Sequence, residues 1–97
     1  MQFNDYKITT QIRSLLVTRW VDLSRVDYGV TNGVVYMNGS LNHHLSRAER
    51  DNPDLAKASD VELVTVLERL VRSIHGVRDV VFKFSNLTKA GSKWKHR

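Results

Sequence analysis

The chain has 97 residues, a length typical of a single domain. It contains no cysteine, which excludes disulfides and thiolate chemistry, and no apolar run near the roughly 20 residues that a membrane-spanning helix needs. The formal net charge is +5, but residues 85–97 hold four Lys or Arg and no acid, so residues 1–84 are close to neutral. No secretory signal pattern opens the sequence. We expect a cytoplasmic location if the chain is complete, and the cell envelope if it is an excised domain.

Residues 5–20 predict an amphipathic helix, because apolar residues recur there at helical spacing. The stripe comprises Ile8, Ile12, Leu15, Leu16 and Trp20. Asn4 or Asp5 can cap the start of this helix. We expect Trp20 to anchor the edge of the core, since large aromatic side chains are used mainly in cores.

The dipeptide Asn32-Gly33 predicts a two-residue β-hairpin turn, because it separates two runs of alternating apolar residues. The strands are expected at residues 25–31 and 34–41. One face would carry Val26, Tyr28 and Val30 from the first strand, and Val35, Met37, Gly39 and Leu41 from the second. Gly29 and Gly39 interrupt the strands, which predicts a bulge or a close approach of another backbone.

Residues 42–58 show no clean periodicity, and we expect a loop there with a turn of helix at residues 45–50. A second helix is predicted at residues 60–75, because Ser59 to Glu62 forms a capping box before an apolar stripe. Pro53 is an alternative, earlier start. Gly76 is expected to end the helix in the left-handed conformation.

A third strand is predicted at residues 78–85, where apolar and polar residues alternate. Residues 86–97 are rich in Gly, Ser and Lys, and we expect a mobile tail. The element order α-β-β-α-β then gives an α+β two-layer sandwich, with two helices on one face of a three-stranded mixed sheet.

The first helix, the hairpin and the Gly-Val-x-x-Val sequence after the second helix together resemble a BON domain. The matching residues are Asn32, Gly33, Val34, Val35, Met37, Gly39, Ser40, Leu41, Gly76, Val77 and Val80. The resemblance covers residues 5–84 and rests on structural positions, chiefly Asn32, Gly33, Gly39 and Gly76. BON domains usually join the second strand to the second helix by a short turn, so residues 42–58 are interpreted as an insertion. We assign residues 1–85 to a BON-like domain and residues 86–97 to a basic flexible tail.

The resemblance implies a non-enzymatic binding or adaptor module that acts at anionic phospholipid surfaces or in a protein assembly. Some family members take small ligands or ions, which is one alternative. No catalytic residue is implied, and the sequence has no nucleophile elbow, Walker loop or dinucleotide-binding motif, so we expect neither an enzyme nor a cofactor. His43 and His44, with Glu49 and Asp51 nearby, lack the spacing of a helical zinc motif. We expect a solvated loop there and no metal site.

The candidate binding residues lie in the predicted tail, and they are Lys89, Lys93, Trp94, Lys95 and Arg97. A Trp between cations suits an anionic membrane surface. The same composition suits a nucleic-acid backbone. This second alternative is less favoured, because the body is nearly neutral and the Gly-x-x-Gly clamp of KH domains is absent. A tail with no partner is the third reading. We expect a monomer or a weak homo-oligomer, since Lys83 on an edge strand discourages strand pairing.

Overall fold

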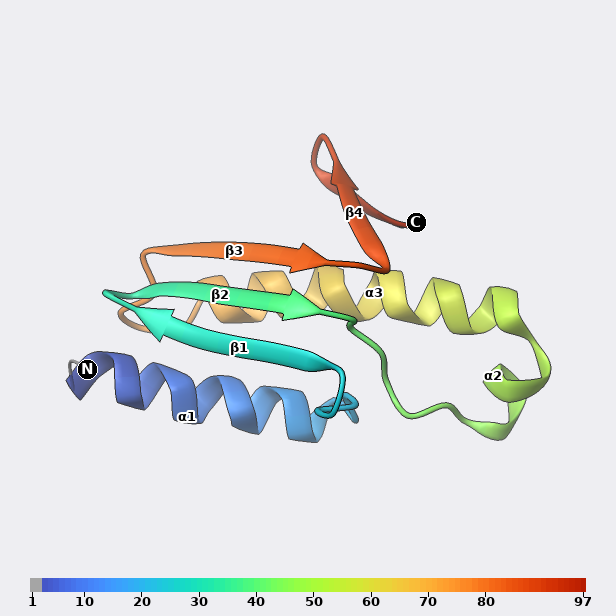
Figure 1. Ribbon diagram of the computed structural model, residues 1–97, viewed down its shortest axis with the longest axis horizontal. Coiled ribbons are helices and arrows are strands. Elements are labelled where there is room, and N and C mark those ends of the chain that lie inside the picture. The colour runs from blue at the N-terminus through green and yellow to red at the C-terminus, as the bar shows by residue number, and fades with distance from the viewer. Residues whose placement is uncertain (1–2) are drawn as a thin grey trace.

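A computed structural model describes residues 3–97 and shows a three-stranded sheet, two long helices and a separate β-hairpin (Figure 1). The elements are α1 (Phe3–Thr18), β1 (Val26–Thr31), β2 (Val34–Gly39), α2 (Arg47–Asp51), α3 (Pro53–Arg72), β3 (Asp79–Phe84), β4 (Leu87–Ala90) and β5 (Lys93–His96). The sheet order is β1-β2-β3, with β1 antiparallel and β3 parallel to β2. The predicted α+β class and the mixed sheet are confirmed. None of the helices between residues 3 and 97 combines the length and the apolar character needed to cross a membrane.

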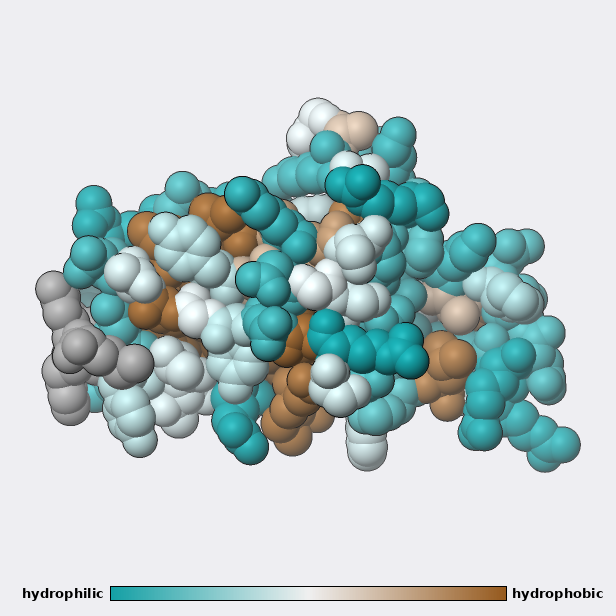
Figure 2. Space-filling model, in the orientation of Figure 1, coloured by the Kyte–Doolittle hydropathy of each residue, from teal (hydrophilic) through white to brown (hydrophobic). Residues whose placement is uncertain are grey.

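Both long helices cover the same face of the sheet, as predicted. Val30 pairs with Val35, and Val35 pairs with Val80, so these three side chains lie on one face. They join Leu16 of α1 and Leu67 of α3 in a single buried cluster. The opposite face is open to solvent, and Figure 2 shows polar and apolar residues interspersed on it.

The turn between β1 and β2 is the predicted one, with φ of 51° at Asn32 and 79° at Gly33. The structure adds a partner that the sequence did not indicate. Asp5 of α1 is 4% exposed, and its carboxylate accepts hydrogen bonds from the backbone N–H of Asn32 and of Gly33, both at 2.9 Å. Because α1 begins at Phe3, Asp5 lies inside the helix. The expectation that Asn4 or Asp5 caps the helix is therefore wrong.

The glycines differ in what they do. Gly39 has a φ of 95°, and a Cβ there would lie 2.4 Å from the carbonyl oxygen of Arg25, so the predicted close approach is confirmed. Gly29 pairs regularly with Tyr36 and has open space beside it, so the same expectation is wrong for Gly29. Gly76 is left-handed, as predicted, but α3 already ends at Arg72. Gly76 therefore shapes the turn into β3.

Trp20 is not an anchor of the core. It is 70% exposed, with a φ of 60°. The N–H of Trp20 bonds to the carbonyl of Val17, and that of Val21 bonds to the carbonyl of Leu16. This is a Schellman motif with Trp in the position where Gly is usual, a conformation that costs a non-Gly residue about 1 to 2 kcal/mol. The motif turns the chain so that Val21 enters the core while Trp20 faces solvent.

Most of residues 42–58 is helical, so the predicted loop is largely wrong. Ser46 and Glu49 form a capping box at the start of α2, close to the predicted turn of helix. Asn52 then caps α3, with Pro53 at its first position, which is the earlier of the two predicted starts. The predicted capping box at Ser59 is wrong, because Ser59 lies inside α3.

Residues 86–97 are not a mobile tail. They form the antiparallel hairpin β4–β5, which projects from the end of β3 (Figure 1) and packs on α3. The side-chain amide of Asn86 exchanges hydrogen bonds with both backbone groups of Leu41, at 3.1 and 2.8 Å. Leu87 is 1% exposed, so the hairpin belongs to the folded core.

Candidate functional site

The C-terminal hairpin presents one face to the body and the other to solvent. Its two-residue turn is Gly91-Ser92, with a φ of 62° at Gly91. Thr88 pairs with Lys95, and Lys89 pairs with Trp94. Because side chains alternate along a strand, residues 94 and 96 face α3 while residues 93 and 95 face outward.

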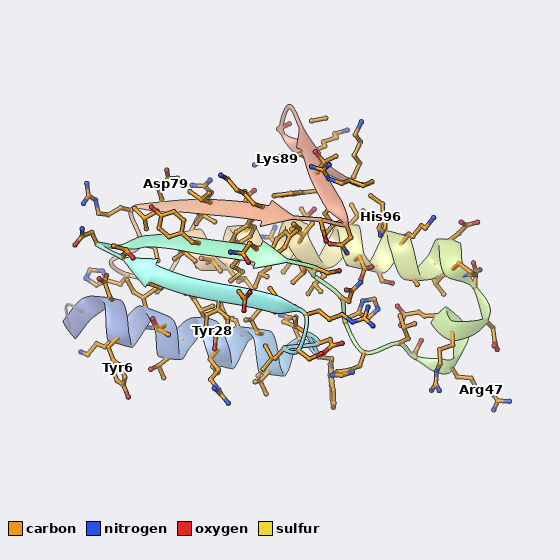
Figure 3. The ribbon with its side chains drawn as sticks, in the orientation of Figure 1. Tyr6, Tyr28, Arg47, Asp79, Lys89 and His96 are labelled. Atoms are coloured by element: carbon orange, nitrogen blue, oxygen red, sulfur yellow. The ribbon has the colours of Figure 1, made fainter. Side chains whose placement is uncertain are left out.

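The inner face attaches the hairpin to the body. Trp94 is 9% exposed, and its ring lies 6.3 Å from the ring of Phe82 and 6.4 Å from that of Phe84. Lys89 Nζ lies 2.9 Å from the carboxylate of Glu68 and 5.7 Å from the centre of the Trp94 ring (Figure 3). Of the five predicted binding residues, Trp94 and Lys89 are thus engaged in contacts with other residues of the protein. The expectation that Trp94 is available to a membrane surface is wrong.

The outer face carries the other three predicted residues, which are Lys93, Lys95 and Arg97. All three are exposed, and no ion pair is formed by their side chains within the described chain. Alternate residues of a strand lie about 7 Å apart, so Lys93 and Lys95 are neighbours on one face of β5, and Arg97 follows directly after the strand. We call these three residues the cationic row.

A second group of charged residues surrounds His43, in the segment between β2 and α2. Its Nδ1 lies 2.8 Å from Oδ1 of Asp60 in α3, and its Nε2 contacts Oε2 of Glu49 in α2. Asp60 is 6% exposed, and its other oxygen lies 3.9 Å from Nε2 of His96 in β5. One chain of charged groups therefore links α2, α3 and the hairpin.

The two carboxylates fix the charge state of His43. A neutral imidazole has one N–H, so only the protonated ring donates to both Glu49 and Asp60. Burial lowers the pKa of His43, but the hydrogen bonds to Glu49 and Asp60 outweigh it and raise the pKa above its ordinary value of 6.5. The hydrogen bond from His43 in turn lowers the pKa of Glu49 to about 2.

The charged groups around His43 form a clasp that joins three segments of the chain. Both ring nitrogens of His43 are occupied by carboxylates. Among the residues that the structure describes, no three His, Asp or Glu side chains are arranged to hold a metal ion. Of the residues that the sequence placed around His43, Glu49 joins it, whereas Asp51 lies exposed at the end of α2.

We expect the clasp to make stability depend on pH. His43 stabilises the fold below its ordinary pKa of 6.5, and this contribution is lost as the pH rises through the raised value. Wild type should therefore lose stability as the pH rises above about 6.5, measured as the urea midpoint at successive pH values. The variant His43→Gln cannot be protonated at this position, so below about pH 6.5 it should be less stable than wild type. Its stability should also change less with pH.

His44→Gln is the matched control, because His44 is the exposed neighbour of His43. It should leave the wild-type slope in place. A His43→Gln profile as steep as that of wild type would show that a group other than His43 is responsible for the pH dependence.

A pocket of about 570 Å³ lies next to the clasp. Trp20 and Leu45 from the N-terminal half of the chain meet Leu63 and Val66 of α3 there, and Glu49, Glu62 and Arg19 add polar groups. The backbone N–H of His44 donates to the carbonyl of Trp20 at 2.8 Å, which holds the Trp20 backbone beside this pocket. Its size and mainly apolar lining are typical of a small-molecule site.

Sequence reasoning missed Asp60 and the folded hairpin for identifiable reasons. Asp60 was assigned to a helix cap, and nothing local indicates a contact with His43, 17 residues away. The hairpin had a signal, because Gly-Ser between alternating residues is a known two-residue turn. The high Lys content obscured it.

The comparisons with known proteins add no relative: no family model matches the chain, and no curated protein or solved structure matches it either. The resemblance to BON domains therefore stays a prediction.

Proposed function

We propose that this protein is a non-enzymatic binding module that engages anionic phospholipid surfaces through the cationic row, Lys93, Lys95 and Arg97. The observation that carries the proposal is the position of these cations. Lys93 and Lys95 stand on the folded strand β5 and Arg97 follows directly after it; all three are exposed and have no acid beside them along this segment. An ordered row loses less entropy on binding than the same charges on a mobile tail.

The cationic row has no exposed aromatic ring of the hairpin beside it, which favours lipid headgroups over nucleic acid as its partner. Single-stranded nucleic acids are usually bound by cations together with exposed aromatic rings on which bases stack. The aromatic ring of the hairpin, Trp94, is buried. Lys side chains act as point charges for phosphate, each contributing about 1 kcal/mol near an anionic surface. The implied BON-like role in a protein assembly rests on the resemblance alone.

Vesicle binding tests the proposal. Wild type should sediment with vesicles that contain phosphatidylglycerol, and less with vesicles of phosphatidylcholine alone. The double variant Lys93→Gln/Lys95→Gln should weaken binding to anionic vesicles by about 30-fold, from about 1 kcal/mol for each lysine. Added salt should weaken binding in the same direction, because exposed charges are screened.

The control variant must also remove two positive charges, but from a part of the surface away from the hairpin. Arg47→Gln/Lys57→Gln does so with two exposed residues on α2 and α3, and Arg47 lies far from the hairpin (Figure 3). This control should bind nearly as wild type. Equal losses in the two double variants would overturn the proposal, as would equal binding to neutral vesicles. Tighter binding to a mixed-sequence oligonucleotide than to vesicles, at one salt concentration, would establish the nucleic-acid alternative instead.

Point substitutions are needed here, because deleting residues 86–97 would remove part of the core. Leu87 and Trp94 both belong to the buried cluster. A truncated chain would therefore report on stability as well as on binding.

A further inference from the structure

A second pocket, of about 680 Å³, lies between β3 and the hairpin, and its lining has an unusual charge. Three cations contribute to it and no Asp or Glu does. Two hydroxyl side chains add hydrogen-bond donors. The polar lining residues are Lys83, Ser85, Thr88, Lys89 and Arg97. We call this the hairpin pocket.

The cations differ in how far they are already neutralised. Lys89 is paired with Glu68, at 2.9 Å. Lys83 and Arg97 form no ion pair within residues 3–97 and are exposed. They come from separate segments, the end of β3 and the end of the hairpin. A negatively charged group between them would be attracted from two sides and would face no nearby lining carboxylate.

An independent observation concerns Trp94, whose ring also lines the hairpin pocket. Its indole Nε1 is buried and has no hydrogen-bond acceptor within the described chain, and it is the one such buried side-chain atom there. A buried donor without an acceptor costs about 1 to 3 kcal/mol. An oxygen acceptor entering the pocket, with a small shift of the ring, would relieve this cost. Unsatisfied buried donors of this kind are rare enough in folded proteins to need an explanation.

We propose that the hairpin pocket binds a phosphate-type oxyanion between Lys83 and Arg97, either as free phosphate or as the phosphate of a lipid headgroup. The proposal deepens the proposed function, on which its lipid form rests, by naming the position at which a headgroup would be held. The aromatic wall of Phe82, Phe84 and Trp94 lies next to the anion and suits the apolar part of a phosphate ester.

A titration followed by ¹H–¹⁵N NMR tests the site in the whole chain. The chain has two indole N–H groups, and Trp20, which lines the other pocket, is an internal control for Trp94. Inorganic phosphate and glycerol 3-phosphate should each shift the Trp94 indole peak and leave the Trp20 peak in place. Trp94→Phe assigns the peaks. Lys83→Gln should weaken the binding of both anions by about tenfold, as expected for the loss of one charged hydrogen bond.

Vesicle binding by the same variants separates the two sources of phosphate. If the site takes lipid headgroups, Lys83→Gln should also weaken binding to anionic vesicles, whereas free-phosphate binding should survive in Lys93→Gln/Lys95→Gln. If wild type binds phosphate but no vesicles, the site stands as a free-anion site and the proposed function fails. If the Trp94 peak does not move with either anion, or if Lys83→Gln binds phosphate as wild type does, the hairpin pocket is not an anion site, whatever the vesicles show.

Discussion

Replacing Gly33 by Val is expected to destabilise the protein by about 2 to 5 kcal/mol. Gly33 has a φ of 79°, which costs a residue with a side chain about 1 to 2 kcal/mol. A Cβ there would lie 2.7 Å from the carbonyl oxygen of Gly76, a backbone atom that cannot move cheaply, and overpacking adds about 1 to 3 kcal/mol. Urea unfolding followed by circular dichroism measures the change.

Gly29→Val is the matched control for this prediction. Gly29 lies in β1 of the same hairpin, needs no positive φ, and has no atom within 4 Å of the position of an added Cβ. Val should be tolerated there or stabilise the strand slightly, since it favours extended backbone. Equal losses of stability in Gly33→Val and Gly29→Val would mean that the turn conformation does not determine which residues are tolerated at position 33.

Replacing Trp94 by Ala is expected to cost about 3 to 5 kcal/mol, the usual range for a large buried aromatic side chain. Trp94 packs against Phe82 and Phe84 and lies beneath Lys89, so its loss would open a cavity between the hairpin and the body. A domain of this kind is stable by about 5 to 15 kcal/mol, so the variant should unfold at a much lower urea concentration.

Trp94→Phe separates packing from hydrogen bonding. Phe keeps the aromatic contact and removes the buried N–H that has no acceptor, so the two effects oppose each other and the net change should stay within about 1 kcal/mol. A Trp94→Ala variant as stable as wild type would contradict the packed hairpin, because substitutions in a mobile segment change stability by less than about 0.5 kcal/mol.

The sequence predicts the parts of the fold that depend on local rules. Asn32-Gly33 favours one turn type, and the alternation of Val30 and Val35 with polar residues assigns a face to each strand, so the sheet could be predicted. Local rules failed at Trp20, because the hydrogen bonds that end α1 place a Trp where Gly is usual. They also failed at Ser59, since a capping sequence and a mid-helix sequence look alike until the packing partner of Asp60 is known.

The sequence predicts which residues belong to the candidate site, but not how they are arranged in space. All five tail residues named from the sequence belong to the hairpin, but period-two alternation divides them between its faces. Trp94 and Lys89 hold the hairpin in place, while Lys93, Lys95 and Arg97 remain outside. From the sequence, Lys83 is only a charge that discourages strand pairing, because the pocket that it lines together with Arg97 depends on how the hairpin docks.

Asp5 connects the N-terminal helix to the turn of the first hairpin across 27 residues of sequence. Its carboxylate occupies both amide groups at that corner, and no residue within the hairpin takes this role. Because α1 and the β1–β2 hairpin share these two hydrogen bonds, we expect them to form together as one cooperative unit rather than one after the other. Any change that separates the first turn of α1 from the sheet would also remove both hydrogen bonds between Asp5 and the Asn32-Gly33 turn.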